Sequence, residues 1–165
     1  MKPAWHALRL AGLYFIAAAT TTHALHADAG SKEYAVNDPA YQQECGSCHV
    51  PYPPALLAAP SWRAVMGGLD KHFGTDASLD AAPRAAILAF LEKNAGARDT
   101  SAGGKPLLRL SDTAWFRKEH DRHVPAATIR LPEVKSIGNC GACHAGAERG
   151  SYAERDIRVP GGRTR

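Results

Sequence analysis

Two copies of one short motif decide how this chain must fold: "ECGSCHV" at residues 44–50 and "NCGACHA" at residues 139–145. Each copy contains Cys-x-x-Cys-His, and together they use all four cysteines of the 165-residue chain. Residues i, i+3 and i+4 lie on one face of a helix, so two thiols one turn apart would stand beside the following imidazole. The residues between the thiols are small, which leaves room for a flat group against the backbone.

This spacing favours covalent attachment of c-type haem over other uses of paired cysteines. Each thiol pair can form thioethers with the two vinyl groups along one haem edge, and the histidine can bind the iron. A four-cysteine zinc site usually separates its two pairs by about 15–20 residues, far fewer than here. Redox disulfides would explain the thiols but not the histidines. We therefore expect two covalently bound haem c groups. The expected thioether residues are Cys45, Cys48, Cys140 and Cys143, and the expected proximal iron ligands are His49 and His144.

Residues 1–27 have the layout of a cleavable secretory signal peptide. Lys2 and Arg9 give a positive start, residues 10–19 are apolar, and small residues allow cleavage after Ala27 or Ala29. The apolar run is about half of the roughly 20 residues that span a bilayer, so a retained anchor is the weaker interpretation. We expect export to the periplasm and no transmembrane segment after cleavage. Loss of Lys2 and Arg9 lowers the formal net charge from +4 to +2, and no basic stripe with aromatics indicates nucleic-acid binding.

Helical signals dominate the mature chain, and we predict an all-α protein with much irregular chain. A Gly- and Ala-rich linker at residues 94–106 separates an N-terminal haem domain (28–97) from a C-terminal haem domain (98–165). No convincing alternating strand is present, and residues 124–139 lack helical periodicity. We expect four helices, which should begin after Asp38, near Ser61, after Asp80, and at Ser111 or Asp112. The third of these helices should end at Gly96.

The far side of each iron needs a second ligand if the site is to be closed, and the choice is small. Outside the leader and the two motifs, the remaining candidates are three histidines and Met66, so at most one haem can be His/Met. We expect Met66 to be a core residue, because it lies inside a predicted helix. His72 stands beside Phe73, which can cover a haem face. His120 has an aromatic flank on its own helix and is preferred to His123, three residues on. The expected pairs are His49 with His72 and His144 with His120.

Several segments of this chain resemble the dihaem cytochrome c (DHC) family of bacterial electron carriers. They are "CGSCH", "SWRAVMGGLDKHFGTDASLD", "WFRKEHD" and "NCGACHAGAERGSYAERDIRVP", which run through most of the mature chain. The resemblance implies two low-spin haems, each with two histidine ligands, and puts His72 and His120 at the distal positions. It also implies an N-terminal half like a class I cytochrome c and a C-terminal half that wraps the second haem with little regular structure.

The function expected from these features is periplasmic electron transfer without enzymatic activity. The resemblance implies redox partner proteins, namely a membrane b-type cytochrome and a small oxygen-binding cytochrome c. Axial methionine raises a haem potential, so two bis-His irons should have low potentials. Two alternatives stay open: a haem enzyme or gas-binding protein with one open iron, and a dihaem electron-transfer subunit of a periplasmic reductase.

Overall fold

The computed structural model describes residue 34 and residues 36–161, and this part of the chain is mostly helical, as expected. The predicted signal peptide lies outside the described residues. No helix in the described part is long and apolar enough to cross a membrane. The α-helices are α2 (Pro39–Gly46), α3 (Ala59–Gly67), α4 (Ala81–Lys93), α5 (Ala114–His120) and α6 (Ala126–Ile129). The strands are β1 (Ser101–Ala102) and β2 (Lys105–Pro106), and the 3-10 helices are η1 (Pro54–Leu56), η2 (Leu69–Lys71), η3 (Leu110–Asp112), η4 (Cys140–Ala142), η5 (Ala147–Arg149) and η6 (Glu154–Asp156).

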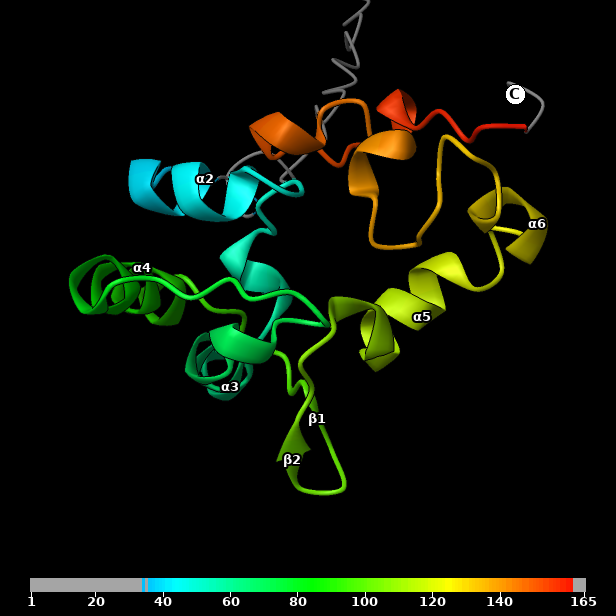
Figure 1. The fold of residues 1–165 in the computed structure, drawn as a ribbon. Helices are drawn as coiled ribbons and strands as arrows, with labels where there is room; N and C mark the ends of the chain where they lie inside the picture. The colour runs from blue at the N-terminus through cyan, green and yellow to red at the C-terminus, as the bar shows by residue number, and fades with distance from the viewer. Residues whose placement is uncertain (1–33, 35, 162–165) are drawn as a thin grey trace, which may run out of the picture.

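Figure 1 shows α2, α3 and α4 gathered on one side of the molecule and α5 and α6 on the other. The hairpin of β1 and β2 projects away from both groups. The segment after residue 140 returns to the chain that follows α2, where a Cβ on Gly141 would lie 3.8 Å from the Val50 side chain. The two Cys-x-x-Cys-His motifs, far apart in sequence, are therefore neighbours in the fold.

The larger hydrophobic core lies where α4 packs on α3 and α2. Ile87 and Leu91, one turn apart on α4, are 0% and 1% exposed, because the i, i+4 spacing puts both on the buried face. Trp62 of α3 fills the same core and donates a hydrogen bond from its indole nitrogen to the Pro54 carbonyl at 2.8 Å. The core members are Val36, Tyr41, Leu57, Trp62, Met66, Leu69, Ile87 and Leu91.

A second, smaller cluster joins the two halves of the chain. Leu56 precedes the linker, whereas Leu110 and Phe116 follow it, and all three are buried together. Four partly buried side chains pack against them: Tyr34, Tyr52, Trp115 and Ile137. The aromatic residues predicted to flank the second haem are thus also part of the contact between the halves.

Between residues 38 and 120 the structure has the predicted number of α-helices, but some of their ends differ from the prediction. α5 is capped by Thr113, whose hydroxyl accepts the Phe116 amide, and not by Ser111 or Asp112. Those two residues belong to the 3-10 helix η3. α4 ends at Lys93, before Gly96. Gly96 is required for another reason: a Cβ there would lie 2.1 Å from the Ala55 carbonyl oxygen.

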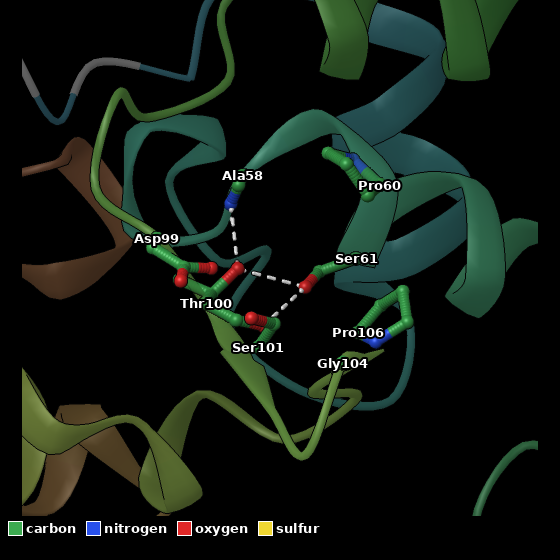
Figure 2. Close-up of a pocket in the computed structure, with 8 residues that line it drawn as sticks. All are labelled: Ala58, Pro60, Ser61, Asp99, Thr100, Ser101, Gly104 and Pro106. Atoms are coloured by element: carbon green, nitrogen blue, oxygen red, sulfur yellow. Dashed lines mark hydrogen bonds between the residues drawn. The ribbon is translucent and has the colours of Figure 1, made fainter.

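The predicted linker contains a short antiparallel hairpin, which the sequence analysis missed. Its strands are only two residues long, too short for alternation to be visible, and Gly103 and Gly104 turn the chain with positive φ angles. Just before it, Thr100 is 5% exposed and is bonded to α3: its hydroxyl accepts the Ala58 amide at 3.0 Å and lies 2.8 Å from the Ser61 hydroxyl. Figure 2 shows this shallow pocket between the linker and α3. It contains none of the candidate iron ligands.

Candidate functional site

His49 and His72, the pair expected at the first site, lie close together. Their ring centroids are 6.2 Å apart and their planes differ by 19°. His49 lies in the turn after α2, and His72 follows η2 at the start of a tight turn closed by a bridge to Thr75. Phe73 has a positive φ of 51°, a conformation that costs energy in a non-glycine residue. This turn places Phe73 edge-on to His72, with centroids 4.9 Å apart.

His120 and His144 form the second facing pair. Their centroids are 6.3 Å apart, almost the same separation as in the first pair, but their planes differ by 63°. His120 ends α5, and His144 is held by a bridge to Ile157 near the C-terminus. His123, the alternative considered from the sequence, is exposed. The structure thus brings together the preferred residues, while iron ligation by them stays a prediction.

The separation within each pair fits one metal atom between two imidazoles. A metal bonded at about 2 Å to a nitrogen of each ring would put the two centroids about 6.3 Å apart. In each pair, one ring nitrogen already makes a hydrogen bond to the backbone. Nδ1 of His49 lies 2.8 Å from the Val50 carbonyl, and Nδ1 of His120 lies 2.8 Å from the Phe116 carbonyl. A carbonyl can only accept, so Nδ1 carries the proton and donates, which leaves Nε2 with a free lone pair.

One imidazole of each pair has a lowered pKa. Burial, then His49 and then Arg109, lowers the pKa of His72. Burial and then His120 lower the pKa of His144. A neutral imidazole is the form that binds metal, so both shifts favour ligation. Met66, the competing ligand, is 3% exposed and lies within the larger core, as expected for a packing residue.

The four cysteines are free thiols beside these pairs. The first motif does not continue as helix: α2 ends at Gly46, so Cys48 lies in the following turn, where Gly and Ser interrupt the helix. The second motif is the single 3-10 turn η4. The His144 amide still donates to the Cys140 carbonyl at 2.8 Å, so the i, i+4 relation predicted from the motif holds there.

One thiol in each motif has a clearly raised pKa. Burial, helped by Glu44, raises the pKa of Cys45 to about 11, and burial raises the pKa of Cys140 to about 11. A redox Cys-x-x-Cys pair instead needs a lowered thiol pKa. Among the described residues, which include all four cysteines, no group of three or more His, Cys, Asp or Glu side chains could hold a metal ion. Two imidazoles alone leave most of a metal's coordination sphere unfilled, which a porphyrin would complete.

At the second pair, two buried polar atoms have no hydrogen-bond partner among the described residues: His144 Nδ1 and the Tyr152 hydroxyl. The two rings are close, with centroids 5.2 Å apart, yet they do not bond each other. Buried polar groups without partners are costly and usually mark a missing group. Haem carries carboxylates that could accept from the Tyr152 hydroxyl. The donor set, the ring separations and the unpaired Tyr152 hydroxyl therefore fit haem.

Phe116, part of the aromatic flank expected beside His120, stacks on that imidazole. Two other residues of the site, Tyr52 and Arg109, carried no signal in the motif search. Tyr52 stacks on His49. Arg109, from beyond the linker, lies over the Phe73 ring with its guanidinium carbon 3.9 Å from the centroid. An aromatic residue three positions after the motif could have drawn attention to Tyr52. The position of Arg109 depends on how the two halves pack, which no local pattern reveals.

Comparison with known proteins points to one family. The family model described as dihaem cytochrome c matches residues 41–152. The solved structure of a diheme cytochrome c from Rhodobacter sphaeroides is 40% identical and covers 72% of this chain and 99% of its own, with a TM-score of 0.66. A structure of DHC purified from the same organism is 44% identical at the same coverage, with a TM-score of 0.63. The diheme cytochrome type c of Shewanella baltica OS155 is 35% identical, with coverages of 74% and 93% and a TM-score of 0.65. A search of curated proteins found no match.

Proposed function

Since this chain belongs to the dihaem cytochrome c family, which implies two c-type haems, we propose that it is an electron carrier with two bis-histidine irons. The observation that carries the proposal is the equal spacing of the two imidazole pairs, 6.2 and 6.3 Å between centroids. Each spacing suits a single iron with imidazoles on both sides. Bound haem would supply a one-electron centre, and the protein determines whether an external ligand can bind its iron.

The chain's own histidines would hold each iron from both sides. The imidazoles of His49 and His120 are each fixed by a backbone carbonyl, so their Nε2 atoms cannot turn away without losing a hydrogen bond. Four thiols would tether the two macrocycles: Cys45 and Cys48 at the first site, Cys140 and Cys143 at the second. Bound haem would supply one-electron chemistry there, and the proposed carrier needs no residue of this chain as acid, base or nucleophile.

Export to the periplasm is part of the proposal. Thioether attachment and the sequence of residues 1–27 both support it, with cleavage after Ala27 or Ala29. The redox partners proposed from the family resemblance are a membrane b-type cytochrome and a small oxygen-binding cytochrome c. N-terminal analysis of mature protein from the periplasmic fraction tests the export step directly.

Carbon monoxide tests the ligation. We expect ferrous protein with two attached haems to keep a low-spin spectrum and to bind no carbon monoxide, because no axial position is open. His72→Ala and His120→Ala should each admit one equivalent, and the double variant two. His123→Ala is the matched control and should admit none. If wild-type protein binds carbon monoxide, one iron is open, and the enzyme or gas-binding alternative replaces the carrier.

A further inference from the structure

The two imidazole pairs have nearly equal separations but different twists. The planes of His49 and His72 differ by 19°, whereas those of His120 and His144 differ by 63°. The first pair is therefore close to parallel and the second is crossed. Since the ligand types are the same at both sites, the difference must come from what surrounds each ring.

One imidazole of each pair lies flat against an aromatic ring. Tyr52 stacks on His49 with centroids 4.8 Å apart and planes 22° apart. Phe116 stacks on His120 at 3.8 Å and 8°. The same two imidazoles are those whose Nδ1 atoms are bonded to backbone carbonyls. A stacked face together with a hydrogen-bonded edge prevents rotation about the metal–nitrogen axis.

Tyr52 is itself held at both ends. Its hydroxyl donates to the Gly138 carbonyl at 2.8 Å, a contact across 86 positions that reaches the chain just before Cys140. Its own carbonyl accepts from the buried Tyr41 hydroxyl, also at 2.8 Å. The ring on which His49 rests is thus fixed by the larger core on one side and by the second haem motif on the other.

We propose that Tyr52 is a positioning residue that holds His49 nearly parallel to His72, so that the two haems have electronically different axial arrangements. The inference rests on the proposed bis-histidine ligation. In low-spin ferric iron the unpaired electron occupies an orbital that overlaps the imidazole π systems. Parallel imidazoles raise one of two such orbitals above the other, which gives a rhombic paramagnetic resonance spectrum. Crossed imidazoles raise both equally, which gives a strongly anisotropic spectrum with a large leading g value.

The consequence for electron transfer is that the two haems are distinguishable by orbital direction as well as by surroundings. The half-filled orbital of the first haem points along one direction set by Tyr52. At the second haem, near-degeneracy removes that preference. Axial orientation and second-shell contacts are among the means by which proteins tune haem irons.

Electron paramagnetic resonance of the fully ferric, haem-loaded protein tests this inference. We expect two low-spin signals, one rhombic and one strongly anisotropic, in equal amounts. His72→Ala should abolish the rhombic signal and His120→Ala the anisotropic one, which assigns each signal to its site. Tyr52→Leu removes the stacked ring, and the rhombic signal should broaden and move to a larger leading g value while the other stays unchanged.

Two further variants separate orientation from folding. Tyr52→Phe keeps the stacked ring and removes only the bond to Gly138, so the rhombic signal should move less than in Tyr52→Leu. Tyr41→Phe removes only the bond to the Tyr52 carbonyl and should likewise move the rhombic signal less than Tyr52→Leu, with the other signal unchanged. Two identical low-spin signals in wild-type protein would overturn the inference, and so would a rhombic signal that Tyr52→Leu leaves unaltered. A high-spin signal in wild-type protein would instead overturn the proposed ligation. Because the wild-type spectrum is itself decisive, the inference stays testable even if Tyr52→Leu fails to retain haem.

Discussion

Replacing Arg109 by glutamine should lower the reduction potential of the first haem, because a nearby positive charge disfavours the ferric state. The guanidinium carbon lies 3.9 Å from the Phe73 centroid, which lies 4.9 Å from the His72 centroid. The charge is therefore within about 9 Å of the His72 ring and about 12 Å of an iron bonded beyond it. At this distance one charge contributes about 0.3 kcal/mol in bulk water and about 1.4 kcal/mol near a protein surface.

These energies correspond to a shift of about 15–60 mV for a one-electron couple. Arg109 is exposed, so water screens its charge and the lower half of that range is expected. The shift should also shrink at about 1 M salt, where the screening length is about 3 Å. Spectroelectrochemical titration of both haems gives the measurement, and only one of the two waves should move.

Two controls accompany this measurement. Arg109→Lys keeps the charge and should keep most of the potential, although its ammonium need not stay over the Phe73 ring. Lys105→Gln makes the same change of charge in the hairpin that projects from the molecule (Figure 1) and should leave both waves in place. If Arg109→Gln raises a potential, or moves both waves equally, Arg109 does not act on the first haem as reasoned here.

Four further substitutions concern stability, each measured as the denaturant midpoint of the haem-loaded protein. Gly96→Ala should destabilise by about 1–3 kcal/mol, because its Cβ would lie 2.1 Å from the Ala55 carbonyl oxygen. Gly67→Ala, within α3 and with no atom within 4 Å of an added Cβ, should be stabilising by up to about 1 kcal/mol, and equal effects at the two glycines would contradict the steric argument. Thr100→Val should cost about 1–3 kcal/mol because the Ala58 amide at the start of α3 loses its acceptor, and an unchanged midpoint would mean that water replaces the hydroxyl. Ile87→Ala should cost about 2–5 kcal/mol, since this side chain is 0% exposed, and a loss below about 1 kcal/mol would indicate that the core collapses around it.

The helices around the first site could be predicted from sequence because their signals are local. Asp38 with Pro39 marks the start of α2, and the Asp38 side chain accepts the Tyr41 amide at 2.7 Å. The i, i+4 spacing of Ile87 and Leu91 marks the buried face of α4. The hairpin in the linker could not be predicted, because two-residue strands have no periodicity to detect. The cap of α5 was misassigned because three successive residues, Ser111, Asp112 and Thr113, all have side chains that can cap a helix.

The amino-acid sequence by itself determined the cofactor chemistry of this protein. Cys-x-x-Cys-His is a motif for covalent haem attachment. Its thioether bonds require only that the two thiols be close together along the chain. Excluding the histidines of the leader and of the two motifs also reduced the candidates for the distal ligand to three histidines and Met66. Met66 could bind only one of the two irons. The family match at residues 41–152 agrees with that derivation of two c-type haems.

Only the tertiary structure decided how the imidazoles are oriented and what surrounds them. Tyr52 reaches Gly138 across 86 positions, and Arg109 crosses from beyond the linker to cover Phe73 beside His72. Such contacts depend on the packing of two halves whose relative position is not encoded in any short stretch. Attachment chemistry is local, whereas the angle between two rings is set by everything that packs against them.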